Sequence, residues 1–260
     1  MSQFLQESQI LRKAPSVFAT SGSKSMSSRY QFIPTIDVLR ALNERGFNVV
    51  DARQSKKRDE IKQGFAKHMI RLRHDDFKID ERTGLTPEII LINSHDGSSS
   101  YTIRGGIYRF ACCNGLVVGN DQFCSRIKHT GNVIDDVTES AAHTIEIMPL
   151  SVKKANEWSD ITLTDAQRLV LAETATQLKW ESGSAPVTPR DVLNIRRSAD
   201  NKKDLWTTFN VIQENLLKGG LHYVCDKGKR SSTRRVKSVN EDIRLNTALW
   251  SLTEKMAELV

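Results

Sequence analysis

The spacing of the apolar positions changes near residue 46. From Thr35 to Gly46, the apolar residues Ile36, Leu39 and Leu42 recur at helical spacing, which places them on one face of a helix. Thr35 is a favourable N-cap, and glycine commonly ends a helix. The pattern therefore predicts a helix between these two residues.

Beyond this helix the apolar runs become short. Residues 47–54, 66–73 and 88–94 show period-two or continuous apolar character between turn residues, which is typical of antiparallel strands. In the second run apolar residues sit among basic ones, so one face can pack inward while the other is basic and exposed. The basic residues of this run are Lys67, His68, Arg71 and Arg73.

The second half of the chain has helical periodicity. Residues 101–118 are apolar and aromatic, and their pattern leaves strand and helix open. After them, a helix capped by Thr164 and another stopped by Gly219-Gly220 are the clearest features. Helices are predicted over residues 137–147, 164–180, 189–195, 205–217 and 239–259. The predicted fold class is α+β: a helix, a three- to four-stranded antiparallel sheet, and then a helical C-terminal half.

Composition divides the chain into three regions. Residues 1–28 are polar and Ser-rich, which predicts a flexible N-terminal arm and is unlike a secretory signal. Residues 29–182 form the predicted α+β core domain, and a Gly, Ser and Pro-rich linker begins at residue 183. Residues 183–260 form the predicted helical C-terminal region, with a basic loop over 227–237.

The charge balance favours an anionic partner. The chain has 38 Lys and Arg against 31 Asp and Glu, a formal charge of +7, and a basic excess favours a polyanion. No run approaches the roughly 20 apolar residues that span a bilayer, so no membrane partner is expected. The four cysteines do not form the dense framework of a secreted scaffold. A cytoplasmic location is therefore expected.

Two basic clusters are candidate contacts for phosphate groups. One cluster follows the first predicted strand and continues in residues 66–73 and 101–118. The other lies in the predicted basic loop, and basic residues in both could neutralise phosphates. The alternative for the first cluster is a solvated hairpin whose positive charges are offset by nearby acids, such as Asp75 and Asp76. The alternative for the second cluster is a solvated surface linker. The candidate nucleic-acid-binding residues are Arg53, Lys56, Lys57, Arg58, Lys67, Arg71, Arg73, Arg104, Arg109, Lys229, Arg230, Arg234, Arg235 and Lys237.

Several aromatic residues could stack on bases. Stacking contributes about 1–3 kcal/mol per base where it occurs. Trp206 and Phe209, however, are three residues apart and precede Ile212 and Leu216, which is the spacing of a buried helix face. A core role is favoured for these two residues, and for Tyr108 among its apolar neighbours.

Candidate metal ligands lack a recognisable spacing. The residues considered are Cys112, Cys113, Cys124, His129, His95 and Asp96. Their spacing differs from that of zinc knuckles, so no metal site is predicted and the thiols are expected to be buried. Asp135 and Asp136 precede a predicted helix, where acids are common, and no phosphate-binding GxxxxGK[ST] motif occurs. No cofactor and no catalytic residue are predicted, with a metal-dependent nuclease using Asp96 left as an alternative.

Three segments resemble a known family. They are Asn93-Ser-His-Asp-Gly-Ser-Ser-Ser, Tyr108-Arg-Phe-Ala-Cys-Cys-Asn-Gly-Leu-Val-Val, and the segment that begins Leu205-Trp-Thr-Thr-Phe-Asn and ends Lys218-Gly-Gly. The chain is thereby identified as a member of the phage and plasmid family called domain of unknown function 932. The order of helix, strands and helix is also similar to the Rad52-like single-strand annealing proteins, a fold-level analogy.

The leading hypothesis is a nucleic-acid-binding protein of a phage or plasmid. The family resemblance implies that setting, and the basic clusters suggest DNA, in particular single-stranded DNA, as the partner. Annealing or recombination by a homo-oligomer is the expected activity. The alternative is an interaction protein that inhibits or diverts a host defence complex, which would require a host protein partner.

Overall fold

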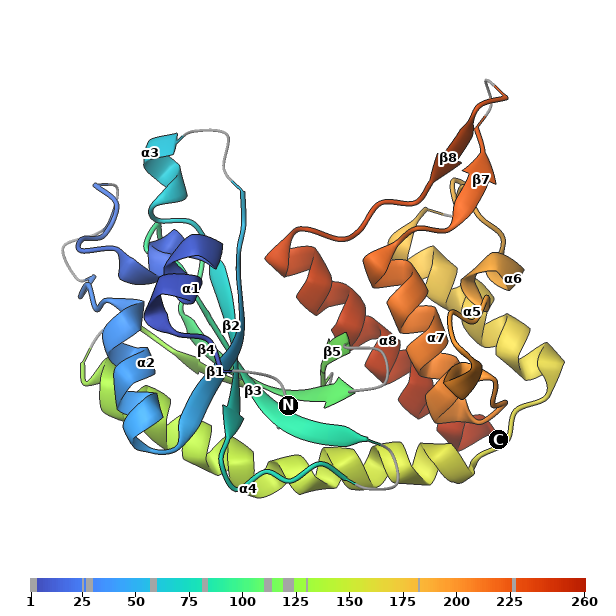
Figure 1. Ribbon diagram of the computed structural model, residues 1–260, viewed down its shortest axis with the longest axis horizontal. Helices are drawn as coiled ribbons and strands as arrows, with labels where there is room; N and C mark the ends of the chain where they lie inside the picture. Colours follow the sequence, from blue (N-terminus) through green and yellow to red (C-terminus); the bar gives the residue numbers. More distant parts are fainter. Residues whose placement is uncertain are drawn as a thin grey trace. The chain divides into compact units, whose positions relative to one another are not determined.

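The chain divides into two compact units. Figure 1 shows the computed structural model. The first unit comprises Met1–Arg109 and Gly115–Leu150, and the second comprises Phe110–Asn114 and Ser151–Val260. The predicted boundary at residue 183 lies inside the second unit. The structure describes residues 4–24, 26, 30–56, 60–80, 84–109, 114–118, 124–129, 131–181, 183–225 and 228–260.

An antiparallel sheet forms the centre of the first unit. Helix α2 (Thr35–Glu44) precedes the sheet, as the sequence predicted. Four strands follow one another across it in chain order, and each pairs antiparallel with the next. They are β1 (Phe47–Gln54), β2 (His68–His74), β3 (Leu85–Asn93) and β4 (Tyr101–Arg109), with the short helix α3 (Glu60–Gln63) between the first two. The predicted α+β class is confirmed.

Two short strands complete the sheet at the far edge of β4. These are β5 (Asn114–Val117) and β6 (Cys124–Ile127). Strand β6 pairs antiparallel with the first half of β4, with Tyr101 opposite Ile127 and Arg104 opposite Cys124. The segment for which strand and helix were both open therefore forms strands over Tyr101–Arg109 and Asn114–Val117.

Helices cover one face of this sheet. Ile70 and Leu72 of β2 point to this face and belong to the core together with Val38 and Leu42 of α2. The first part of α4 (Val133–Asp160) contributes Val137 to the same core, and Figure 1 shows α2 and α4 beside the sheet. The core thus lies between the sheet and helices far apart in the sequence.

The N-terminal segment is part of this core, so the predicted flexible arm is wrong over residues 4–24. It contains α1 (Glu7–Lys13) and a 3-10 turn, η1 (Pro15–Phe18). Ile10, Ala14 and Val17 are fully or almost fully buried. Their spacing of four and three residues puts them on one side of the segment, a signal that the polar composition around them conceals.

The opposite face of the sheet buries a charged triad. Glu88 of β3 has no exposed side-chain surface, and it accepts hydrogen bonds from Arg71 Nε at 2.6 Å and from Arg73 Nη2 at 2.7 Å. The guanidinium of Arg71 lies so close to β4 and β5 that a Cβ at Gly115 would stand 2.4 Å from its Cζ. The predicted exposed basic face is therefore wrong for Arg71 and Arg73, because both are buried against a carboxylate.

The change Glu88→Gln should destabilise the first unit. It leaves two buried guanidinium groups without a counter-charge, which typically costs about 3–5 kcal/mol. Urea unfolding followed by circular dichroism measures the free energy of unfolding. Asp76→Asn, at a side chain that is 88% exposed, is the control and should have little effect. An unchanged stability of Glu88→Gln would contradict this role for the triad.

The second unit is helical apart from one hairpin. The predicted helices are present, although the one predicted over 189–195 is a single turn that ends at Val192. Helix α4 runs unbroken from residue 133 to 160 with Pro149 inside it, a residue that usually ends or kinks a helix. The N-cap predicted at Thr164 is formed, since its hydroxyl accepts from Gln167 N. The elements are the end of α4, α5 (Asp165–Lys179), α6 (Pro189–Val192), η4 (Ser198–Asp200), α7 (Leu205–Lys218), β7 (His222–Val224), β8 (Arg230–Ser232) and α8 (Val239–Leu259).

Aromatic rings from α4, α7 and α8 form the core of the second unit. The ring of Trp158 lies 4.6 Å from that of Trp250 and 6.0 Å from that of Phe209. Trp206 stacks on Phe209 at 5.4 Å. The core role predicted for Trp206 and Phe209 is confirmed, because both are at most 3% exposed.

A buried pair of amide side chains joins two helices of this unit. Gln213 of α7 donates to the amide oxygen of Asn246 of α8 at 2.8 Å, and both residues are buried. Such a pair fixes the rotation of one helix against the other, because a mismatch would leave a buried amide unsatisfied. In the described ranges, no helix combines the length and apolar character that crossing a bilayer requires.

Candidate nucleic-acid interface

A cationic hairpin is the most strongly basic feature of the second unit. Residues 227–237 were predicted as a loop, but within them β8 pairs antiparallel with β7, with Val224 opposite Arg230 and His222 opposite Ser232. In the turn, the Cys225 N–H donates to the Lys229 carbonyl at 3.0 Å. Figure 1 shows the two strands projecting from the helices of their unit. Each strand has three residues, too few for a periodic signal.

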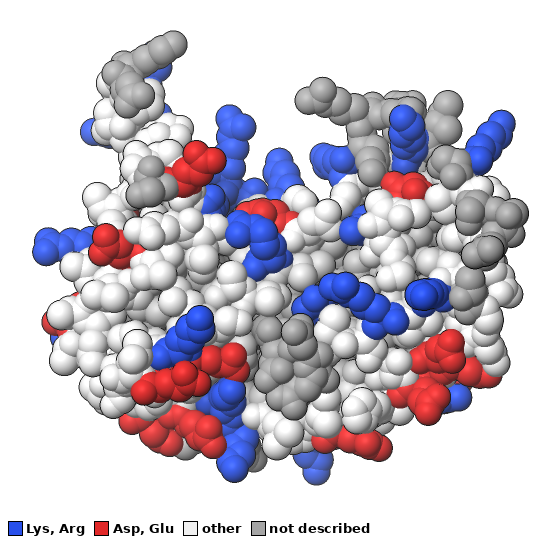
Figure 2. Space-filling view, turned by 180° about the vertical axis from the view of Figure 1, so that it is seen from behind, with Lys and Arg blue, Asp and Glu red and all other residues white. Residues whose placement is uncertain are grey.

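The basic side chains of this segment face solvent. They are Lys229, Arg230, Arg234, Arg235 and Lys237, named here the hairpin cations, and all five residues are exposed. From Gly228 to Lys237 the sequence has no acidic residue. Within the described part of the chain, no hairpin cation makes an ion pair. Figure 2 shows basic side chains on the projecting hairpin, at the upper left of that view.

Two glycines attach the hairpin to the end of α7. Gly219 and Gly220 have φ of 67° and 84°, a region that favours glycine. Gly220 N donates to the Thr233 carbonyl at 2.8 Å, and Thr233 N donates to the Leu221 carbonyl at 2.8 Å. A Cβ on Gly219 would stand 2.5 Å from the Thr233 carbonyl oxygen. The hairpin cations therefore emerge from a fixed backbone.

Replacing Gly219 by alanine should loosen this attachment. The backbone clash adds to the unfavourable φ, for a cost of about 2–4 kcal/mol, measurable by urea unfolding. Gly183→Ala is the matched control, because Gly183 has φ of 79° but open space around its Cα. The control should cost only about 1 kcal/mol. Equal effects of the two changes would disprove the clash.

The candidate residues of the first unit do not form one patch of free charge. Arg53 and Arg104 share the sheet face of Arg71, by the register of the strands, but Arg53 pairs with Asp51 at 3.0 Å. Arg109 is only 7% exposed. Lys56 is exposed, and Lys67 and Arg104 are half-buried. Lys57 and Arg58 lie outside the described residues, as do Cys112 and Cys113, whereas Cys124 and Cys225 are free thiols.

A buried histidine network lies on the helix-covered side of the same sheet. The hydroxyl of Thr35, at the start of α2, is 2.9 Å from His68 Nε2 and 3.2 Å from His95 Nε2. It also accepts from the Asn93 amide at 3.0 Å. On its other side His68 Nδ1 is 2.8 Å from the Ser16 hydroxyl. His68 was assigned to the basic face, which is wrong: it points into the core.

These histidines are neutral. Burial lowers the pKa of His68 to about 3 and the pKa of His95 to about 4, and each is lowered further by a neighbouring histidine. Burial also lowers the pKa of His129, whose ring lies 4.9 Å from that of Tyr101. In the part of the chain that the structure describes, no group of three or more His, Cys, Asp or Glu could hold a metal ion. The network is suited to fixing α2 on the sheet.

The stability of the protein should fall in acid because of this network. The unfolded chain binds protons at these histidines near pH 6.5, whereas in the folded chain His68 and His95 bind them only near pH 4 and below. The free energy of unfolding should therefore decrease from about pH 6.5 downward, by up to about 1.4 kcal/mol per pH unit for each histidine. Urea unfolding at a series of pH values measures this slope.

Two substitutions test the origin of the pH dependence. His68→Gln should make the slope shallower, because one of the titrating groups is gone. His143→Gln, at a side chain that is 65% exposed, should leave the slope unchanged. A free energy that stays flat from pH 6.5 to pH 4.5 in the unmodified protein would contradict the prediction.

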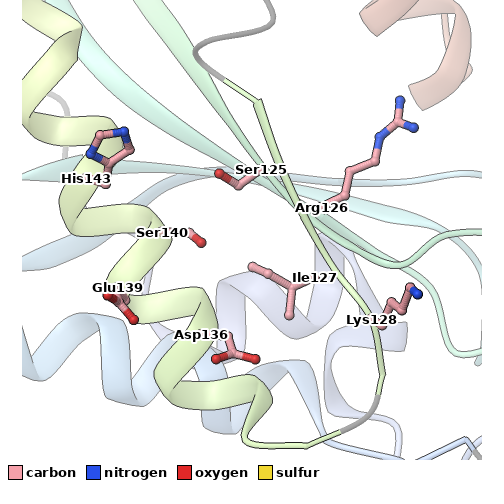
Figure 3. Close-up of a pocket in the computed structure, with 8 residues that line it drawn as sticks. All are labelled: Ser125, Arg126, Ile127, Lys128, Asp136, Glu139, Ser140 and His143. Atoms are coloured by element: carbon pink, nitrogen blue, oxygen red, sulfur yellow. The ribbon is translucent and has the colours of Figure 1, made fainter.

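An open pocket between β6 and α4 carries charges of both signs. It has a volume of about 590 Å³. Figure 3 shows Ser125 and Ile127 directed toward the helix, while Arg126 and Lys128 point away from it. On the helix side the lining includes Asp136 and Glu139, so carboxylates face the space. A phosphate backbone is not expected to enter this pocket.

The fold and the hairpin together define an α+β protein with an uncompensated basic ribbon. The chain belongs to the family described as "Domain of unknown function (DUF932)", whose model matches residues 23–250. The predicted family is confirmed. Similar proteins are the UPF0380 proteins YafZ and YfjQ of Escherichia coli (strain K12), each 39% identical over 253 residues, covering 97% of this chain and 91% of the relative. No solved structure matches the chain, and the likeness to Rad52-like proteins stays a prediction.

Proposed function

We propose that this protein binds nucleic acid through the hairpin cations. The observation that carries the proposal is the exposure of five basic side chains on one short segment that has no acidic residue and, in the described ranges, no ion pair. Elsewhere in the same unit several basic side chains are paired: Arg197, for example, contacts Asp200 at 2.6 Å and Glu214 at 2.7 Å.

A polyanion explains why these charges remain unpaired. Cations close together repel one another in the free protein, and a chain of phosphates relieves this repulsion while releasing its own bound counterions. The exposed hydroxyls of Ser231 and Ser232 lie between the cations and can donate to phosphate oxygens. The half-buried Arg104 and the exposed Lys56 of the first unit are secondary candidates.

The finer proposals concern the strand type and the biological role. Annealing of single-stranded DNA by a homo-oligomer of a phage or plasmid requires single-strand binding and a multimeric mass in solution. The interaction with a host defence complex requires a protein partner instead. Binding measurements with single-stranded and double-stranded DNA, together with the mass in solution, separate these roles from one another.

Reversing three hairpin cations should abolish most of the binding. In the triple variant Arg230→Glu, Arg234→Glu and Arg235→Glu, the affinity for labelled DNA should fall on the order of 100-fold at low salt, and the slope of log affinity against log salt should decrease by about 3. Fluorescence anisotropy across a salt series gives both quantities, and light scattering gives the mass.

The control reverses the same number of charges elsewhere. Arg12→Glu, Lys78→Glu and Lys255→Glu change exposed residues and alter the net charge equally, so they should weaken binding only slightly. If both triple variants lose affinity equally, net charge and not the hairpin is responsible. Absence of binding to any DNA at low salt would refute the proposal and direct the search to a protein partner.

A further inference from the structure

The shape and side chains of the hairpin specify the kind of nucleic acid. We infer that the β7–β8 ribbon enters the major groove of double-stranded DNA, an inference that rests on the proposed function. The sequence favoured single strands, and the argument for a duplex comes from three features: the width of the ribbon, the residues on its open face, and the burial of the aromatic residues.

A two-stranded ribbon fits one groove in particular. Paired strands lie about 4.8 Å apart, and β7 and β8 pair without a third strand. The major groove of B-form DNA is about 12 Å wide and admits such a ribbon, whereas the undistorted minor groove, at about 6 Å, is too narrow for it. The major groove of duplex RNA is too narrow for side chains to read. The ribbon therefore matches B-form DNA.

One face of the ribbon is open and has the chemistry of base-edge contacts. His222, Val224, Arg230 and Ser232 form this face, because directly paired residues point to the same side. All four are exposed, and Val224 has 66% of its surface free. Arginine pairs with guanine, serine bonds to several bases, and an apolar group contacts the thymine methyl. The opposite face carries Tyr223, which is half-buried.

Cations flank this face where phosphates would lie. Lys229 precedes β8, and Arg234, Arg235 and Lys237 follow it. The segment thus combines a base-reading face with phosphate contacts beside it.

The aromatic residues do not support binding of a single strand in this unit. Sequence-tolerant single-strand binding depends on exposed rings on which bases stack. Among the described residues of the second unit, Trp158, Trp206, Phe209 and Trp250 are at most 3% exposed, and Trp180 and Tyr223 are half-buried. No described Trp, Tyr or Phe side chain of this unit is exposed, so contacts along a duplex are favoured.

The test compares three ligands of one sequence: duplex DNA of about 20 base pairs, two helical turns, its single strand, and duplex RNA. The full chain should bind duplex DNA about tenfold or more tightly than either of the others. Methylation of guanine N7, which lies in the major groove, should weaken duplex binding. Equal or tighter binding of the single strand, or no effect of methylation, would overturn the inference.

Two valine substitutions locate the contact. Val224→Asp places a carboxylate on the open face and should lower duplex affinity about tenfold or more. Val170→Asp, at a valine of α5 that is 57% exposed, is the matched control and should leave affinity unchanged; an equal loss in both overturns the inference.

The two proposals fail separately. If the triple hairpin variant loses binding to single strands while duplexes bind no better, nucleic-acid binding stands and the groove assignment falls. If no nucleic acid binds at all, both fall.

Discussion

The first unit depends on the buried ion pairs that the carboxylate of Glu88 forms with Arg71 and Arg73. The carboxylate has no exposed surface, and it holds Arg71 and Arg73 on a sheet face where a lone guanidinium could not remain charged at acceptable cost. The consequences extend across the sheet. Because Arg71 reaches to the carbonyls of Ile107 and Leu116, a Cβ at position 115 would clash with its guanidinium.

The same arginines show why charge in a sequence does not identify a binding surface. Period-two alternation correctly places Arg71 and Arg73 on one face of β2, and it cannot tell whether that face is covered. The acid that neutralises them, Glu88, lies 15 or more residues away in the sequence, in the neighbouring strand β3. The hairpin cations differ because the segment that contains them, residues 228–237, has no acidic residue. For the hairpin cations, the absence of a neutralising acid within the segment can be read directly from the sequence.

The order of elements was largely predictable, and the exceptions have local causes. Strong periodicity identified α2, the first three strands and the helices of the second half. The amino-terminal helix was missed because Ile10, Ala14 and Val17 are few apolar residues in a polar context. The hairpin was missed because its strands are too short for a pattern. The histidine network joins residues 16, 35, 68 and 95. These residues are far apart in the sequence and are brought together only by the tertiary fold, so their spacing could not predict the network.

The amide pair between α7 and α8 limits how the second unit can change its sequence. Gln213 and Asn246 satisfy each other inside the helical core. Replacing one of them by an apolar residue leaves the amide of the other without its partner, and a loss of Asn246 also removes the donor to Asp242. In the evolution of this family, these two positions should therefore covary, and the pair would mark which helices touch even where the rest of the sequence has diverged.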